Sequence, residues 1–253
     1  MDWTPRTTLG KQVARGEVKD IATVFREGMK IREPEIVDAL LPNLKSEVIL
    51  FGGSPGKGGG VKRTTTRRTV RMHRSGRRFN ISALVLVGAP GYVGYGKASS
   101  NEHRVAIDKA VQAAKLNLIP VRRGCGSWEC SCNHSHSIPM KAIGKAGAVK
   151  VILLPAPKGV GLCIGEEGKK VMRLCGIRDL WIKVIGDTRT RMNYVVAIID
   201  SFKNLNKTRA NFPEVSDGKE IVEIISEETG ASMEEEISTE EGAPVVQEVG
   251  ENG

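Results

Sequence analysis

The sequence predicts an α+β fold, with two modest domains behind a helical N-terminal extension. One observation is the alternation of apolar and polar residues over residues 69–87, which is the period-two pattern of half-buried strands. Another is the helical spacing of apolar residues over residues 101–116 and 188–205. A chain of 253 residues, 40% of them apolar, is long enough to fill two such cores.

Residues 1–60 are predicted to form a helical extension that ends in a glycine-rich loop. Residues 17–41 are expected to be helical. One face of the first helix carries Val18, Ile21, Val24 and Phe25. Pro34 suits the first turn of a second helix, and Pro42 ends it. Residues 52–60 contain six glycines, a composition that indicates a flexible loop.

A strongly basic hairpin is predicted next. Residues 61–79 hold eight Lys or Arg residues and no Asp or Glu. Val70 and Met72 alternate with polar residues, so the basic side chains are expected on a strand with one apolar face. Ser75-Gly76 supplies the turn. The strand after the turn is apolar at every second position, namely at Phe79, Ile81, Ala83, Val85 and Val87.

Basic strands with a basic tip suit the binding of phosphate groups. A generic basic surface is the alternative, but such surfaces usually interleave acidic residues. The candidate phosphate-binding residues of the hairpin are Arg67, Arg68, Arg71, Arg74, Arg77 and Arg78.

A third strand and a helix complete the first predicted domain, residues 61–119. The turn at Pro90-Gly91 leads to a strand over residues 92–95. Asn101 is expected to cap a helix that ends at Leu116. The packing face of this helix carries Ala106, Ala110, Ala113 and Ala114.

Residues 91–97 almost match the phosphate-binding P-loop, G-x-x-x-x-G-K-[ST]. Ala98 replaces the hydroxyl residue that would bind magnesium, which argues against a nucleotide triphosphatase. We interpret the glycines as places where another backbone approaches closely, such as an RNA ribose-phosphate chain, with Lys97 as a phosphate contact. A plain set of β-turns is the alternative.

The second domain, residues 138–206, is predicted to contain strands and helices in turn. Residues 149–154 form a buried strand. A helix over Glu166–Cys175 follows, with Gly176 as its C-terminal cap. Residues 180–185 form another strand ahead of the last helix.

Four further arginines are candidate phosphate contacts. Two of them begin the last helix, where cations oppose the helix dipole unless an anion binds beside them. Two others flank the cysteine loop of the linker between the domains. The four are Arg189 and Arg191 in the helix, and Arg122 and Arg123 beside the cysteine loop. The alternative for the helical pair is two solvated side chains.

The linker, residues 120–137, carries a C-x4-C-x-C-x3-H group of candidate metal ligands. The group consists of Cys125, Cys130, Cys132 and His136, with His134 as a substitute for the last. Three thiolates and one imidazole suit a closed tetrahedral site in which zinc is structural. Trp128 is expected to pack over the site. The alternatives are a loop of reduced thiols and a cysteine nucleophile with a histidine partner.

The charge of the chain is divided unevenly. Residues 210–253 hold 13 acidic residues and one basic residue, whereas the other 209 residues hold 37 basic and 16 acidic residues, a net charge of +21. We expect the body to bind a polyanion and residues 207–253 to be a disordered acidic tail. The sequence has neither a membrane-length apolar run nor a signal-peptide core. Five cysteines, an odd number, favour the reducing cytosol.

Seven segments, in order, resemble the family of small-subunit ribosomal protein S-five, the universal small-subunit protein five, in its archaeal branch. The match covers roughly residues 3–205 and leaves out the acidic tail. The segments are residues 75–79 (SGRRF), 83–88 (ALVLVG), 91–97 (GYVGYGK), 121–130 (VRRGCGSWEC), 136–139 (HSIP), 154–161 (LPAPKGVG) and 174–179 (LCGIRD).

The resemblance implies a first domain similar to a double-stranded-RNA-binding domain and a second domain with the βαβ-type fold of this family. It implies a structural, non-catalytic protein of the small ribosomal subunit in the cytoplasm, which binds ribosomal RNA near the decoding region and the messenger RNA entry channel. Subunit assembly and translational accuracy would depend on it. The implied neighbours are ribosomal proteins S-four, S-eight and, in archaea, S-two.

The resemblance also implies roles for particular residues. The hairpin tip, residues 75–78, would reach the RNA, and residues 145–151 would face a neighbouring protein. The cysteine-rich loop is similar to a zinc site in the archaeal branch, where His136 is preferred to His134 as the fourth ligand.

Two other functions are compatible with these patterns. A free double-stranded-RNA-binding regulator would need only the first domain. A zinc-dependent RNA enzyme would need an open metal position and a general base, and no paired carboxylates accompany the cysteines. Aromatic residues make up only 4% of the chain, which argues against recognition of single strands by base stacking.

Overall fold

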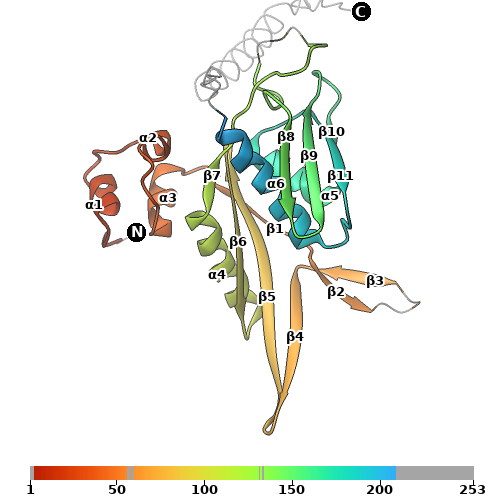
Figure 1. The fold of residues 1–253 in the computed structure, drawn as a ribbon. Helices are drawn as coiled ribbons and strands as arrows, with labels where there is room; N and C mark the ends of the chain where they lie inside the picture. The colour runs from red at the N-terminus through yellow and green to blue at the C-terminus, as the bar shows by residue number, and fades with distance from the viewer. Residues whose placement is uncertain (1–2, 56–57, 59, 131, 133, 209–253) are drawn as a thin grey trace, which may run out of the picture. The chain divides into compact units, whose positions relative to one another are not determined.

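Figure 1 shows the computed structural model, which describes residues 3–55, 58, 60–130, 132 and 134–208. The predicted acidic tail lies outside these residues, apart from its first two. The described part combines helices with β-sheets, in agreement with the predicted α+β class. No helix within it has the length and apolar character that crossing a lipid bilayer requires.

Three short helices open the chain, α1 (Thr8–Ala14), α2 (Ile21–Arg26) and α3 (Pro34–Leu40). Helices α2 and α3 confirm the predicted helical region, and Pro34 lies in the first turn of α3 as expected. The pattern did not indicate α1. One residue from each helix contributes to a small shared core, namely Leu9, Val24 and Ile36.

The first sheet is built around β5 (Gly76–Ala89), which pairs with strands on both sides. On one side lies β6 (Tyr92–Ser100), followed by β7 (Leu118–Pro120). On the other side, β4 (Thr66–His73) pairs with the first half of β5 and β1 (Lys45–Val48) with the second half. The predicted hairpin is therefore confirmed as β4 and β5, whereas β1 and β7 are additional strands.

The chain between β1 and β4 forms a separate two-stranded hairpin, β2 (Gly52–Pro55) and β3 (Val61–Thr64). The prediction of a flexible loop over residues 52–60 is wrong for its first four residues. These glycine-rich residues become a strand because β3 supplies backbone hydrogen-bond partners, and composition alone does not reveal such pairing.

Strand β5 is buried on both faces along its second half. One face packs against α4 (His103–Leu116) and confirms the predicted alternation of the strand. The contacting residues are Ile81, Ala83, Val85 and Val87 of β5 with Ala106, Ala110 and Ala114 of α4. The other face carries Leu84 and Leu86 into a larger core. Asn101 does not cap α4, because the helix begins two residues later, with Glu102 at the N-cap.

Gly94 and Gly96 of β6 lie directly against α4. A Cβ atom at Gly94 would lie 2.3 Å from the carbonyl oxygen of Ala114, and one at Gly96 would lie 2.1 Å from that of Ala110. The predicted close approach of another backbone therefore occurs, but the approaching backbone belongs to α4. The interpretation that an RNA chain occupies this position is wrong, because the helix fills the space.

The second sheet has the order β10 (Leu162–Cys163), β11 (Leu180–Ile185), β9 (Val149–Pro155) and β8 (Ala142–Ala146). Strands β9 and β11 confirm the two predicted strands of this region. Strand β8 forms an antiparallel hairpin with β9. Strands β8 and β10 were not predicted, because each is short and depends on its neighbours for pairing.

Two helices accompany this sheet, α5 (Glu166–Cys175) and α6 (Arg191–Asn206). Helix α5 has the predicted bounds, and its Gly176 cap has the left-handed φ of 78°. Helix α6 begins three residues later than predicted, because the backbone N–H of Arg189 and the hydroxyl of Thr190 bond Asp187 in a turn.

One continuous hydrophobic core joins the two predicted domains. Helix α6 packs on β8 and β9, and α5 packs on β5 and β6 of the first sheet. The shared core includes Leu84 and Leu86 from β5 together with Val171 and Met172 from α5. The domain boundaries at residues 61, 120 and 138 stay predictions.

A buried carboxylate ties the two helices to the end of β1. Glu167 of α5 accepts from Nη1 of Arg191 at 2.6 Å, and that nitrogen also donates to the carbonyl oxygen of Leu50 at 2.8 Å. Lys170 lies 3.2 Å from the second carboxylate oxygen and donates to the carbonyl oxygen of Val48. The ion pairs and these hydrogen bonds thus fix α5 and α6 against the end of β1.

A methyl group at Gly96 should separate α4 from the sheet. We expect Gly96→Ala to lower the free energy of unfolding by about 2 to 3 kcal/mol, since overpacking of a close contact costs this much. Urea denaturation measures the change. Gly60→Ala is the matched control, because a Cβ there meets nothing within 4 Å. Equal stability of the two variants would show that α4 does not constrain β6.

Arg191→Met should destabilise the fold, because it leaves Glu167 buried without its closest cation. The expected loss is about 2 kcal/mol in the free energy of unfolding. Arg189→Met serves as the control, since Arg189 pairs with Asp187 at an exposed position. The control should keep the wild-type urea midpoint, and a similar midpoint for both variants would contradict a stabilising role for the Glu167 pair.

Candidate metal centre and nucleic-acid interface

The cysteine-rich linker is closed by backbone contacts between its two ends. Gly124 and Ser137 exchange two N–H to O bonds of 3.0 Å each. Gly126 lies so close to the linker's far end that a Cβ would be 2.1 Å from the carbonyl oxygen of Pro139. The hydroxyl of Ser137 accepts the backbone N–H of Ala156, which follows β9. The linker is therefore attached to the second sheet as well as closed on itself.

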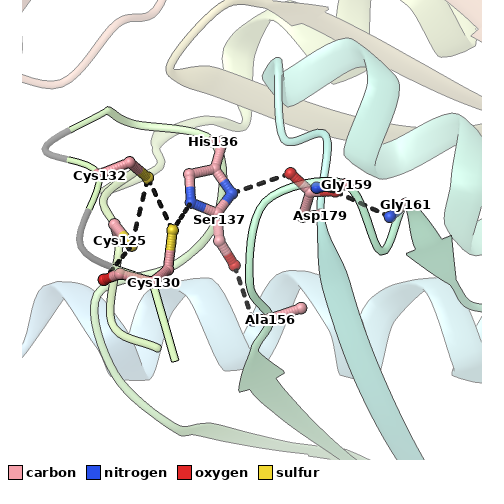
Figure 2. Close-up of polar contacts among 9 residues, drawn as sticks. All are labelled: Cys125, Cys130, Cys132, His136, Ser137, Ala156, Gly159, Gly161 and Asp179. Carbon is pink, nitrogen blue, oxygen red and sulfur yellow. Dashed lines mark hydrogen bonds and ion pairs between the residues drawn. The ribbon is translucent and has the colours of Figure 1, made fainter. Parts of the chain in front are cut away.

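The four predicted ligands converge inside this loop (Figure 2). The Sγ atoms of Cys125, Cys130 and Cys132 and a ring nitrogen of His136 all lie within 4.8 Å of one another. The Cys125–Cys132 sulfur separation and the distance from the Cys130 sulfur to Nε2 of His136 are both 3.7 Å. Ligands of a tetrahedral zinc with Zn–S bonds of about 2.3 Å lie about 3.5 to 3.8 Å apart.

One pair in the cluster is closer than a bound metal would leave it. The Cys130 and Cys132 sulfurs are 2.9 Å apart, so both would move outward around an ion. The cluster could hold a metal ion with all four positions supplied by the protein. Such a site has no open position for a substrate, which suits a structural role.

Asp179 fixes the orientation of the histidine (Figure 2). Its Oδ2 lies 2.9 Å from Nδ1 of His136, and both side chains are buried. Its Oδ1 accepts the backbone N–H groups of Gly159 at 3.1 Å and Gly161 at 2.8 Å. The carboxylate therefore has partners on both oxygens, and it leaves Nε2 of His136 facing the sulfurs. His134 is exposed and lies outside the cluster.

The thiols of the cluster differ in acidity. Hydrogen bonds from the side chain and backbone of Cys132, and from the backbone of Lys158, lower the pKa of Cys130 to about 6. Burial, with hydrogen bonds to the other two thiols, raises the pKa of Cys125 to about 11. The pKa of Cys130 is therefore lower than that of Cys125, and a cation in the cluster would favour the thiolate form of both.

Trp128 does not cover the cluster. Its side chain is 91% exposed, so the prediction that it packs over the ligands is wrong. Trp128 lies in a turn closed by the bond from the N–H of Cys130 to the carbonyl oxygen of Ser127.

The β4–β5 hairpin extends beyond the rest of the first sheet (Figure 1). Strand β6 ends at Ser100 opposite Ile81, so the hairpin has no third strand from Asn80 outward. The six predicted arginines are all exposed on it. The predicted apolar face is present, but Val70, Met72 and Phe79 are exposed on it instead of packing against another element. No other element packs against the outer hairpin within the described chain.

The hairpin register concentrates positive charge. Arg71 lies directly opposite Arg78, and Met72 lies opposite Arg77. Like charges facing each other across two strands repel, and none of the hairpin arginines pairs with a carboxylate among the described residues. Arg68 stacks over the ring of Phe79 at 4.7 Å. An anion bound between the arginines would relieve the repulsion.

The other five predicted contacts lie elsewhere. Lys97 is exposed on β6. Arg122 is half-buried and donates to the carbonyl oxygen of Thr208 at 3.1 Å, and Arg123 is half-buried beside Gly91. Arg189 is exposed, in the turn before α6 instead of inside it, whereas Arg191 points inward to Glu167. Their roles in RNA binding stay predictions.

Sequence reasoning missed two buried carboxylates, Asp179 beside the candidate ligand His136 and Glu167 beside the predicted RNA contact Arg191. Asp179 is 43 residues from His136, and no local spacing connects the two. Glu167 was assigned only to the dipole of its helix. Burial of a carboxylate is the signal that marks both, and it appears only in the folded chain.

Comparison with known proteins identifies the family. A model described as Ribosomal protein S5, N-terminal domain, matches residues 61–122, and one described as Ribosomal protein S5, C-terminal domain, matches residues 144–215. Relatives named small ribosomal subunit protein uS5 extend the match over most of the chain. The protein of Methanocaldococcus jannaschii is 46% identical over 209 residues, which is 82% of this chain and 89% of the relative.

Two further relatives agree. The protein of Methanothermobacter thermautotrophicus is 46% identical over 211 residues, 83% of this chain and 91% of its own length. One from Methanococcus maripaludis is 47% identical over 208 residues, 82% of this chain and 84% of its own length. The identity and coverage confirm the resemblance to the archaeal branch, and the chain belongs to the uS5 family of small ribosomal subunit proteins.

Proposed function

We propose that the chain is a structural constituent of the small ribosomal subunit and binds ribosomal RNA with its β4–β5 hairpin. The observation that carries this proposal is the exposed hairpin with facing arginines and no acidic partner. The uS5 relatives are small ribosomal subunit proteins, so the protein works in the cytoplasm as part of the ribosome. Catalysis is not part of the proposal, since ribosomal proteins of this family are structural.

The proposed mechanism is charge neutralisation with a fit of shape. Arginines on the hairpin replace counterions of the RNA phosphates, and the released ions drive binding. The order β4, β5, β6 and α4 supports a likeness of the first domain to a double-stranded-RNA-binding domain. Such domains recognise the phosphate and ribose groups of a helix more than its sequence.

From the family resemblance we also propose a location for the protein in the subunit. It would lie near the decoding region and the messenger RNA entry channel, beside ribosomal proteins S-four, S-eight and S-two. Subunit assembly and translational accuracy would depend on these contacts. Residues 145–151 form the turn end of the β8–β9 hairpin, and the exposed Lys145 and Lys150 there support the idea that it faces a neighbour.

A free double-stranded-RNA-binding regulator is the alternative function. It would need only the first domain to fold, but Leu84 and Leu86 of β5 are buried against residues of the second half. Co-sedimentation with ribosomal particles separates the two proposals. Retention at one copy per small subunit after a high-salt wash supports the ribosomal constituent, whereas loss to the free fraction at moderate salt favours the regulator.

We further propose that Cys125, Cys130, Cys132 and His136 hold a structural zinc ion. Three thiolates and one imidazole are the donors that zinc prefers, and the two 3.7 Å separations fit a tetrahedral site. Zinc would neutralise the thiolates and join both ends of the linker. Asp179 would act as the partner that orients the ligating imidazole. A zinc-dependent RNA enzyme has less support, because the protein fills every position of the site.

Replacing the hairpin-tip arginines should weaken RNA binding and its dependence on salt. For Arg74→Gln, Arg77→Gln and Arg78→Gln together, we expect the slope of log affinity against log salt to fall by about 2 to 3. Titration of a duplex RNA at several salt concentrations measures it. Lys11, Lys19 and Lys30, all exposed in the N-terminal region, form the control triple when changed to Gln. Equal slopes for both triples would refute the assignment of the interface to the hairpin.

The two histidines of the linker should differ in their effect on metal content. We expect His136→Ala to lose zinc and His134→Ala to keep one zinc per chain, as measured by elemental analysis. Asp179→Asn should lower the zinc affinity about 10- to 100-fold in chelator competition, since it removes the partner of the ligand. Asp187→Asn, at an exposed carboxyl, is its control. Full zinc affinity in the Asp179 variant would rule out its orienting role.

A further inference from the structure

Trp128 is displayed to solvent in a way that the other tryptophans are not. The chain has three tryptophans. Trp128 is 91% exposed, whereas Trp181 is 36% exposed and Trp3 is half-buried with its Nε1 bonded to Glu33. Tryptophan is highly buried on average, because its ring carries a large apolar area. An almost fully exposed indole is therefore unusual for tryptophan, and we ask what could cover it.

The loop that carries Trp128 is fixed from both sides. Cys125 and Cys130, two members of the ligand cluster, bracket it. The turn bond from the N–H of Cys130 to the carbonyl oxygen of Ser127 encloses the tryptophan. Gly126 on the near side is in contact with Pro139. The backbone that carries Trp128 is thus held in place. A ligand that binds the indole would therefore need to order little more than the two side-chain torsions of Trp128.

The charges near this loop are mainly positive. Lys158 is exposed, and its backbone N–H bonds the Cys130 sulfur. Arg178 is exposed as well, and its backbone N–H donates to the carbonyl oxygen of His136 at 2.9 Å. Glu129 is the acidic residue next to the indole in sequence. A phosphate chain could therefore run past Trp128 between cations.

We propose that Trp128 is a stacking platform for one unpaired base of RNA. The inference rests on the proposed role in RNA binding and adds a second contact to that of the hairpin. A single aromatic face with cations around it is what base stacking needs. A protein interface needs a wider apolar centre, and the loop offers none, since the neighbours of Trp128 in sequence are Gly126, Ser127 and Glu129.

The test compares two RNA hairpins that differ only in one bulged nucleotide, which is the fluorescent base 2-aminopurine. We expect Trp128→Ala to weaken binding of the bulged RNA about 5- to 150-fold and to leave the fully paired RNA unchanged. Trp128→Phe should keep most of the affinity, because its ring still stacks. Trp128→Leu should behave like Trp128→Ala, because leucine is apolar but has no ring.

Fluorescence supplies an independent readout. The bulged 2-aminopurine should be quenched on the wild-type chain and remain bright on Trp128→Leu at saturating protein. Zinc content equal to wild type shows that each variant keeps the loop intact. Arg74→Gln, a change in the hairpin, is the comparison, since it should weaken both RNAs alike.

Each outcome decides between the proposals. If Trp128→Leu binds the bulged RNA as tightly as the wild type, the contact needs only an apolar side chain, and the base-stacking proposal is overturned. An equal loss on both RNAs in Trp128→Ala, or equal binding of both RNAs by the wild type without quenching, would overturn the platform and leave the hairpin proposal standing. Failure of the wild-type chain to bind either RNA would overturn the proposed function and the platform with it.

Discussion

The burial of β5 on both faces is the constraint on which the rest of the structure depends. One face of its second half packs against α4, and the other face packs into the large core shared with α5 and α6. Glycines at Gly94 and Gly96 let α4 approach the neighbouring strand closely enough to complete the first layer. The first residues of the same strand, before Ile81, have only β4 as a pairing partner. One strand thus anchors the core and presents the basic hairpin.

Stability and the proposed function are in conflict on that hairpin. Arg71 faces Arg78 across the strands, and Val70, Met72 and Phe79 are exposed. Repulsion between like charges and exposure of apolar groups both disfavour the isolated hairpin. Such local violations of folding rules are expected at binding surfaces, where a partner supplies the missing interactions. The phosphates of an RNA helix would provide the opposite charge.

The end of the linker at His136 and Ser137 shows the opposite arrangement, because the side chains of both residues have hydrogen-bond partners. Asp179 bonds the ring of His136 and two backbone N–H groups of the loop at Gly159 and Gly161. This carboxylate joins the candidate metal ligands to the chain between β9 and β10. Metal in the cluster would therefore hold the linker against the second sheet, and the same rigidity would hold Trp128 at the surface.

The sequence by itself determined the features that depend on near neighbours. Alternation predicted the β4–β5 hairpin, Gly176 predicted the end of α5, and spacing predicted the four candidate ligands within twelve residues. Only the tertiary structure decided the pairing of β1 with β5, the inward turn of Arg191 to Glu167, the Asp179–His136 contact and the exposure of Trp128. Local patterns reflect the backbone's own periodicity. The features decided by the tertiary structure depend on residues far apart in the chain and exist only once the core has formed.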